Sequence, residues 1–297
     1  MRLGGHIYWA GTPAELETLC ERLDFHGLST VVAPIDGEGK ISDEACAEYG
    51  EKARELGIVV GEIGMWENLM TPDAAQQERR IQSVRCMLRK AEIMGCRCVV
   101  TLVGTRHPSD AALAPHPYLF TRECRREFRE IVLRILDGLD LTRTRYAIEP
   151  WHNTFFYQPE DIREFLNSVG HPALALHLDQ MNMVDQRSFF DTTSLIERTF
   201  ELLADKVAAA HLKDIRCDHT HMFLKWDEVP IGDGVLDYGT YLRRLAELPA
   251  DTPCFCEHMQ EERDYALCFT RLHQLADKAG VRFLRREDRT QPARIQE

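Results

Sequence analysis

The amino-acid sequence predicts a single-domain (β/α)8 barrel. Short apolar segments that suit strands alternate with amphipathic segments that suit helices, eight times between residues 3 and 280. The strand segments are bounded by glycine and proline and are apolar on both faces, which is typical of a parallel sheet covered by helices. The chain has 297 residues, and one such barrel typically needs about 250.

The eight expected strands are rich in β-branched and other apolar residues. They cover residues 3–8, 28–34, 58–63, 97–103, 145–151, 174–181, 207–215 and 253–259. Right-handed strand–helix units in this number close most readily into a barrel. An open doubly wound sheet is the alternative, and it is disfavoured because no glycine fingerprint follows the first strand.

The intervening helices carry start and stop signals. Thr12, Pro13 and Glu15 combine an N-cap, a proline at the first helical position and a capping-box glutamate. The other helices are expected at residues 42–57, up to 95, from 121, at 159–170, at 193–203, after 237 and up to 280. We expect the barrel to occupy residues 1–281. A polar tail should occupy residues 282–297, either loose or packed on a neighbouring subunit.

Charge limits the classes of partner. The formal net charge is −12, from 48 acidic and 36 basic residues, and such a surface repels phosphate backbones and anionic lipids. Nucleic acid and membranes are therefore not expected partners, whereas homo-oligomer formation is left open. No apolar signal core and no run of membrane-spanning length is present, so we expect a cytoplasmic protein. The ten cysteines include no CxxC pair, which favours buried free thiols.

Four expected strands carry a side chain that can bind a metal at their carboxyl ends, where barrels of this class place their active sites. These residues are Glu149, Asp179, His211 and Glu257. Because strand side chains alternate between the two faces, their apolar neighbours can face the helices while all four converge inward. Three carboxylates and an imidazole form a cage for one divalent metal, with Mn²⁺ as first choice and Mg²⁺ or Co²⁺ as alternatives.

Each of these residues also has a structural interpretation when it is taken alone. Glu149 could anchor a loop, and Asp179 could cap the loop that follows it. His211 could be a core histidine, and Glu257 could form an ion pair with Lys213 or Arg216. The set at the ends of strands five to eight is more informative than any one member.

The chain resembles the xylose isomerase-like barrel superfamily, which includes sugar isomerases, ketose 3-epimerases, keto-inositol dehydratases and endonuclease-IV-type enzymes. The stretches that carry the resemblance are Glu149-Pro150-Trp151, Leu178-Asp179-Gln180-Met181-Asn182, His211-Leu212-Lys213-Asp214, Gly232-Asp233-Gly234 and Cys256-Glu257-His258. In the epimerase branch a Glu, Asp, His, Glu quartet in this order binds one metal, and its glutamates exchange the substrate proton. The resemblance implies that Glu149 and Glu257 are catalytic as well as metal ligands.

We therefore expect a metal-dependent sugar isomerase or epimerase that removes a proton next to a carbonyl, through an enediolate held by the metal. The alternative is a metal-dependent lyase or dehydratase that performs β-elimination on a keto-sugar, keto-inositol or 3-oxo-glycoside. The sequence departs from the epimerase branch at Phe155, Asn182 and Cys217, and residues 211–216 look closer to the dehydratase branch. A DNA-repair enzyme, disfavoured by the acidic charge, and a non-catalytic carbohydrate-binding barrel are further alternatives.

Six other residues are candidates for binding a carbohydrate substrate. They are Lys213, His177, His6, Trp66, His107 and His152. The first two lie two residues from a metal ligand on the same strand and therefore share its face. The next three follow the first, third and fourth strands, where sugar-binding side chains commonly lie, and the last closely follows Glu149. An ion pair for Lys213 and a core position for His177 are the alternatives.

Overall fold

Eight parallel strands form one sheet in a computed structural model that describes residues 1–223, 225–290 and 295. The strands are β1 (Arg2–Gly5), β2 (Thr30–Val32), β3 (Val59–Met65), β4 (Cys98–Thr101), β5 (Arg145–Ile148), β6 (Leu174–Asp179), β7 (Val207–Leu212) and β10 (Pro253–Cys256). Their order in the sheet is β1-β10-β7-β6-β5-β4-β3-β2. The two edge strands, β1 and β2, also lie close to each other. The backbone N–H of Ser29, directly before β2, donates to the carbonyl of Leu3 in β1 at 2.9 Å. The sheet is therefore a nearly closed barrel.

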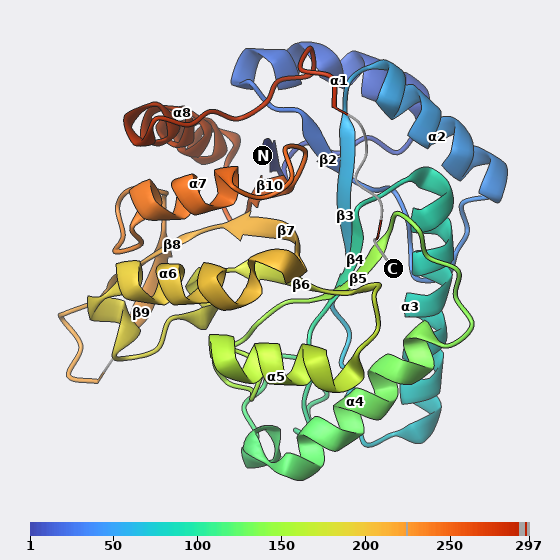
Figure 1. Cartoon of the computed structure of the whole chain (residues 1–297), viewed down its shortest axis with the longest axis vertical. Coiled ribbons are helices and arrows are strands. Elements are labelled where there is room, and N and C mark those ends of the chain that lie inside the picture. Colours follow the sequence, from blue (N-terminus) through green and yellow to red (C-terminus); the bar gives the residue numbers. More distant parts are fainter. Residues whose placement is uncertain (224, 291–294, 296–297) are drawn as a thin grey trace.

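Eight α-helices surround the sheet (Figure 1). They are α1 (Pro13–His26), α2 (Asp43–Glu55), α3 (Ala74–Met94), α4 (Arg122–Leu136), α5 (Pro159–Val169), α6 (Thr192–Leu203), α7 (Tyr238–Ala246) and α8 (Glu262–Ala279). Short 3₁₀ helices lie between some of them: η1 (Pro117–Phe120), η2 (Met181–Met183), η3 (Ser188–Phe190) and η4 (Ala204–Lys206). This architecture confirms the predicted single-domain (β/α)8 barrel.

The helix boundaries follow the capping signals in the sequence. The Thr12 hydroxyl accepts a hydrogen bond from the backbone N–H of Glu15, and the Glu15 carboxylate accepts one from the backbone N–H of Thr12. Gly95 and Gly170 end their helices at φ values of 78° and 67°. Glycine adopts this left-handed conformation without the steric penalty that a side chain would add.

Seven of the eight strands end earlier than predicted, β3 ends two residues later, at Met65, and the predicted strand 207–215 is two strands. β5 ends at Ile148 and β10 ends at Cys256, so Glu149 and Glu257 are the first residues of the loops that follow. The predicted strand 207–215 divides into β7 and β8 (Asp214–Cys217). β8 leaves the barrel and pairs antiparallel with β9 (Trp226–Val229), so a hairpin lies beside the carboxyl end of β7.

Small side chains line part of the barrel interior. Ala147, Ala175 and Ala209 form a buried cluster with Cys98 and Val100. Each of these alanines lies two positions before a large polar residue of the same chain segment, at 149, 177 and 211. Because strand side chains repeat every second residue, the polar side chains share the interior with the alanines and lie nearer the carboxyl ends of the strands.

The first part of the predicted tail packs on its own barrel. Phe283 is buried, and the backbone N–H of Leu284 donates to the carbonyl of Met1 at 2.9 Å. The guanidinium of Arg286 forms an ion pair with Asp24 at 2.6 Å. Apolar and ionic contacts therefore hold residues 282–290 to the N-terminal strand and α1 of the same chain. Residues 291–294 and 296–297 of that tail lie outside the described residues.

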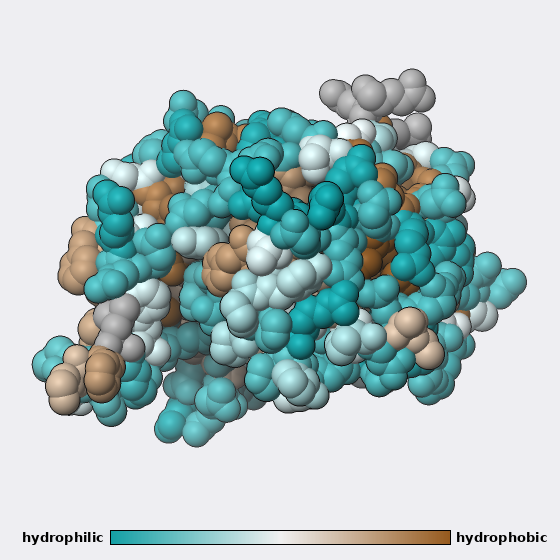
Figure 2. All heavy atoms as spheres, turned by 90° about the horizontal axis from the view of Figure 1, so that it is seen from below, coloured by the Kyte–Doolittle hydropathy of each residue, from teal (hydrophilic) through white to brown (hydrophobic). Residues whose placement is uncertain are grey.

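The surface is mostly hydrophilic on the face shown in Figure 2, with hydrophobic residues scattered over it. Among the helices of the described residues, none combines the length and apolar character needed to cross a membrane. All ten cysteines are free thiols; seven are buried, and Cys20, Cys86 and Cys217 are partly buried.

Candidate metal centre and active site

The four predicted metal ligands meet at the carboxyl ends of four neighbouring strands. Glu149 follows β5, Asp179 ends β6, His211 lies in β7 and Glu257 follows β10, in the order in which these strands lie side by side. One ligand atom from each residue lies within 4.8 Å of the others. All four side chains are buried, so their charges are removed from water and must be balanced by one another or by a cation.

His211 lies at the centre of this group. Its Nδ1 is 2.8 Å from Glu257 Oε1, 3.3 Å from Glu149 Oε1 and 3.7 Å from Asp179 Oδ2. Asp179 and His211 are direct partners in the β6–β7 register, so the parallel pairing itself brings this carboxylate next to the imidazole. One nitrogen therefore faces three carboxylates.

Lys213 adds a second positive charge to the same cluster. Its Nζ lies 2.6 Å from Asp179 Oδ2, 2.8 Å from Glu257 Oε1 and 4.0 Å from Glu149 Oε1. The side chain is buried, and it shares the face of His211, as the two-residue spacing predicts. The ammonium thus lies among the oxygens that a metal would need.

The pKa values of the three acids in the cluster are shifted in different directions. Burial raises the pKa of Glu149, whereas Asp179 and Glu257 have lowered pKa values. For these two, burial opposes ionisation, but the positive charges of Lys213 and His211 outweigh it. Burial also opposes the charge on His211, yet the surrounding carboxylates raise the pKa of its imidazole well above the usual range.

The residues fit a divalent metal. Within the part of the chain that the structure describes, no donor is aligned for a hydrogen bond to the buried oxygens Asp179 Oδ2 and Glu257 Oε1, although the Lys213 ammonium lies at ion-pair distance from both. Carboxylate oxygens with one imidazole suit Mg²⁺, Mn²⁺ or a related ion. A cation held between these two oxygens would satisfy both.

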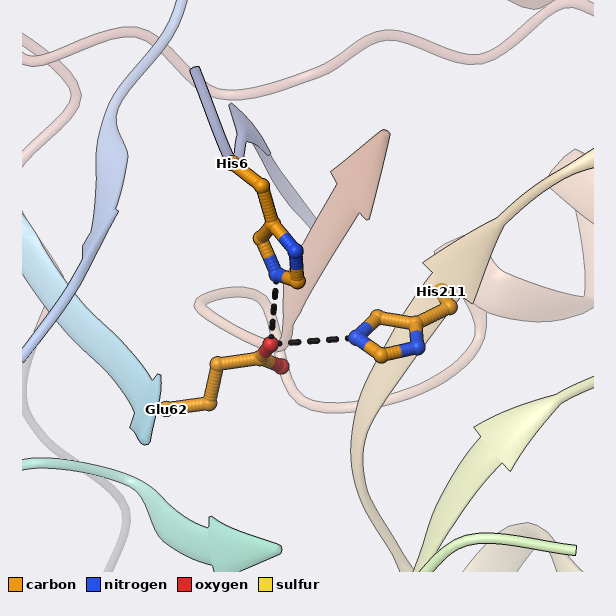
Figure 3. A group of neighbouring side chains, drawn as sticks. All are labelled: His6, Glu62 and His211. Carbon is orange, nitrogen blue, oxygen red and sulfur yellow. Dashed lines mark hydrogen bonds and ion pairs between the residues drawn. The ribbon is translucent and has the colours of Figure 1, made fainter. Parts of the chain in front are cut away.

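Sequence reasoning missed Glu62, a buried carboxylate of β3. Its Oε1 lies 2.8 Å from His6 Nε2 and 3.0 Å from His211 Nε2, as Figure 3 shows. Its Oε2 lies 2.6 Å from His177 Nε2. The signal was present in the sequence, because Glu62 is the one charged residue in the apolar strand segment 58–63.

Two further residues, Asn182 and His258, help to hold the acidic side chains of the site in position. The Asn182 side-chain amide donates to Glu149 Oε1 at 2.9 Å, and the Asn182 backbone N–H donates to Asp179 Oδ1 at 3.1 Å. His258 has a φ of 61°, in the left-handed region that a side chain disfavours. Its Nδ1 lies 3.0 Å from Glu228 Oε2, which links the strand end beside Glu257 to the β8–β9 hairpin.

The structure places the other predicted substrate-binding residues at different depths. His177 is completely buried, with its ring centroid 4.1 Å from that of His211. His6 keeps 27% of its side chain exposed, and Trp66 is 44% exposed directly after β3. The His107 ring hydrogen-bonds to Ser109 of its own loop. The ring of His152 packs against Trp151, at a centroid distance of 4.7 Å.

The fold and this cluster together define a (β/α)8 barrel with a group of buried acidic side chains at the carboxyl ends of its strands. The family model described as the xylose isomerase-like TIM barrel matches residues 18–286. The chain therefore belongs to the xylose isomerase-like TIM barrel family.

Solved structures with a similar fold include proteins of several activities. A xylose isomerase-like TIM barrel protein from Mycobacterium smegmatis in complex with magnesium is 16% identical, with a TM-score of 0.63 over 90% of each chain. A probable 3-DHS dehydratase from Bacillus anthracis is 15% identical, with a TM-score of 0.62 over 86% of this chain and 92% of that chain.

A D-allulose 3-epimerase from Methylomonas sp. is 14% identical, with a TM-score of 0.63 over 94% of this chain and 98% of that chain. Identities at this level show a shared fold alone. None of the curated proteins matches this chain.

Proposed function

We propose that the protein is a divalent-metal-dependent carbohydrate isomerase or epimerase that removes a proton from the carbon next to a carbonyl. The observation that carries this proposal is the convergence of Glu149, Asp179, His211 and Glu257 within 4.8 Å. Glu149 and Glu257 stand at the two ends of the row β5-β6-β7-β10. A substrate carbon above the middle of the row therefore has a carboxylate on either side.

The quartet would hold the metal, and a bound divalent ion supplies Lewis-acid polarisation of a carbonyl together with orientation of the substrate. Mn²⁺ suits this mixed oxygen and nitrogen set, and the magnesium in the similar Mycobacterium smegmatis protein supports a divalent ion of this kind.

The protein's own groups would move the proton. The positive charges of His211 and Lys213 lower the pKa of Glu257 and keep it ionised, and this carboxylate would accept the substrate proton. Glu149, whose pKa burial raises, would hold and return a proton on the opposite side. Two carboxylates that act from opposite sides of a carbon can invert its configuration, and positioned acid–base groups contribute about 10²–10⁴-fold to such a rate.

The rim of the site would bind the rest of the sugar. The partly exposed Trp66 offers an aromatic face for the apolar side of a sugar ring. The partly exposed imidazole of His6 lies 3.4 Å from Glu257 Oε2 through its Nδ1, close enough to reach a hydroxyl beside the reacting carbon. A small-molecule carbohydrate is therefore the proposed substrate.

A lyase that eliminates a β-substituent from a keto-sugar or keto-inositol is the second candidate. The observation that favours it is the Lys213 ammonium, 2.8 Å from Glu257 Oε1. Glu257 would remove the proton next to the carbonyl, and Lys213, once it has moved away from Asp179 and Glu257, would protonate the departing hydroxyl. In addition, Phe155 packs in the core against Phe128 and Phe165, so this position, which carries a substrate-binding glutamate in the epimerase branch, supplies no polar contact here.

The test is incubation of the manganese-loaded protein with candidate keto-sugars in D₂O, followed by proton NMR and mass spectrometry. Deuterium in a recovered epimer or isomer supports the first candidate. Loss of water or of an aglycone with an unsaturated product supports the second. Absence of both exchange and elimination over a broad panel of sugars, in a protein that binds manganese, would contradict both candidates.

A further inference from the structure

Glu62 contacts one of the four candidate metal ligands, His211, without belonging to that quartet itself. It lies on β3, which is separated from β5, β6, β7 and β10 in the sheet by β4 on one side and by β2 and β1 on the other. Its carboxylate reaches across the barrel interior to His6, His177 and His211. Figure 3 shows its Oε1 between the rings of His6 and His211. A buried carboxylate with three imidazole partners is unusual for a residue that has no chemical role of its own.

The contact with His211 determines which nitrogen can bind a metal. Glu62 Oε1 lies 3.0 Å from His211 Nε2, and a carboxylate can only accept a hydrogen bond. Nε2 must therefore carry a proton, and in the neutral ring Nδ1 is left with its lone pair free. Nδ1 is the nitrogen that faces Glu149, Asp179 and Glu257. The carboxylate thus selects the tautomer that presents a lone pair to the cage.

The other two contacts keep Glu62 itself in place. The Nε2 atoms of His6 and His177 approach different oxygens of the carboxylate, at 2.8 Å and 2.6 Å. Both of its oxygens are therefore occupied, and rotation of the carboxylate would break at least one contact. His6 also connects Glu62 to a second ligand, since His6 Nδ1 lies 3.4 Å from Glu257 Oε2.

We propose that Glu62 is a positioning residue that holds His211 with Nε2 protonated and Nδ1 directed at the cation, and that it thereby sets the affinity of the metal centre. The proposal rests on the proposed function in one respect, namely that the quartet binds a divalent ion. Carboxylates that accept a hydrogen bond from a metal-binding histidine orient the ring and raise its basicity, and their loss typically weakens metal binding by about 10–100-fold.

Glu62→Gln tests the proposal with little change in volume. An amide has one acceptor oxygen and one donor nitrogen, so it cannot accept from His177 and His211 at the same time. Where its NH₂ group faces His211, it favours the tautomer with the proton on Nδ1, the wrong one for the cage. We expect the dissociation constant for Mn²⁺, measured by calorimetry on chelator-treated protein, to rise about 10–100-fold. The visible absorption spectrum of the Co²⁺-loaded protein should also change.

Glu92→Gln is the matched control. Glu92 is likewise mostly buried, and its carboxylate accepts hydrogen bonds from the backbone N–H groups of Arg143 and Thr144 and from the Thr142 hydroxyl. These partners precede β5, at the opposite end of the barrel from the cage. Glu92→Gln should lower the melting temperature and leave both the Mn²⁺ affinity and the Co²⁺ spectrum unchanged.

A second measurement needs no variant. In a crystal structure of the zinc-loaded wild-type protein, we expect His211 to bind zinc through Nδ1 and to keep its Nε2 contact with Glu62. Zinc bound by Nε2, or by Glu62 itself, would overturn the positioning role. So would a well-folded Glu62→Gln protein with wild-type Mn²⁺ affinity and Co²⁺ spectrum. If the wild-type protein binds no divalent ion at all, the proposed function fails first, and that result is distinguishable from the others.

Discussion

The Lys213 ammonium lies 2.6 Å from Asp179 Oδ2, inside the group of acids that the sequence predicts to be metal ligands. A lysine and a divalent ion are attracted to the same oxygens for the same reason, since each places positive charge beside buried carboxylates. The two therefore compete, and the side chain of Lys213 must move when a metal is bound by Asp179 and Glu257 together.

Lys213→Met should separate the structural role of this lysine from metal binding. In metal-free protein the variant loses a buried partner of Asp179 and Glu257, and loss of one partner of a buried ion pair costs about 3–5 kcal/mol. The melting temperature of the metal-free variant should fall, and Mn²⁺ should raise it by more than it raises that of the wild type.

Differential scanning fluorimetry with and without Mn²⁺ checks this prediction. Lys206→Met, at a lysine 3.6 Å from Asp205 on the surface, is the control and should change neither quantity appreciably. An equal manganese-induced shift in Lys213→Met and wild type would show that the ammonium and the metal do not share a position.

Glu257→Gln should reduce turnover by about 10²–10⁴-fold, because the amide cannot accept the substrate proton. The fold should persist, since the substitution keeps the shape of the side chain. Steady-state rates on a substrate found by the deuterium screen provide the measurement. Glu123→Gln, on the exposed surface of α4, should leave the rate unchanged. A Glu257→Gln enzyme with near-wild-type turnover would remove Glu257 from the proton-transfer step.

Gly234→Ala should destabilise the loop that follows the β8–β9 hairpin. Asp214 Oδ2 accepts hydrogen bonds from the backbone N–H groups of Gly232 and Gly234 at 3.0 Å and 3.1 Å. A Cβ at Gly234 would overlap with Asp214 Oδ1 and with the carbonyl of Ile215. We expect urea unfolding to show a loss of about 1–3 kcal/mol.

The control is Gly37→Ala, where the nearest atom to a new Cβ is the Cβ of Ser83, at an ordinary contact distance of 3.5 Å. It should change the unfolding free energy by less than about 0.5 kcal/mol. Equal effects of the two substitutions would mean that the Asp214 contacts do not constrain the loop.

Asp110 should contribute stability that depends on pH. The guanidinium of Arg80 donates to both of its carboxylate oxygens, at 3.0 Å and 2.6 Å, and lowers the pKa of Asp110 from its ordinary value of 3.8 to about 2. Because the folded-state pKa is depressed, this contribution is complete above about pH 4 and disappears as the pH falls through about 2.

Asp110→Asn checks the sign of this effect. The difference in unfolding free energy between wild type and variant should be constant from pH 7 to about pH 4 and should shrink at lower pH. Urea unfolding at a series of pH values gives the comparison. A difference that stays the same down to pH 3 would mean that ionised Asp110 is not what Arg80 stabilises.

The barrel and the convergence of the four candidate ligands could be predicted because local patterns encode them. Strand-end positions and period-two alternation place Glu149, Asp179, His211 and Glu257 on the inner face without knowledge of any long-range contact. The capping signals likewise act within one turn of helix, and the predicted boundary at Gly95 is confirmed for this reason.

Other features depend on contacts between distant segments. Glu62 is separated from its partners His177 and His211 by 115 and 149 residues, and a single glutamate in an apolar segment does not reveal which histidines surround it. The β8–β9 hairpin was missed because Lys213 and Asp214 stand between two apolar residues, Leu212 and Ile215, and no glycine or proline marks where the chain leaves the barrel.

The packing of residues 282–290 was missed for a related reason. Arg286 looks solvent-exposed within a charged run, and only the fold brings Asp24 to it. Burial of Phe283 against the barrel adds the apolar contact that holds this segment.

The most direct measurement is a calorimetric titration of Mn²⁺ into chelator-treated wild-type protein, combined with elemental analysis and a melting curve. We predict one manganese ion per chain, a raised melting temperature, and loss of both effects in Asp179→Asn. No bound ion, no heat of binding and an unchanged melting temperature would contradict the metal centre on which the proposed chemistry depends.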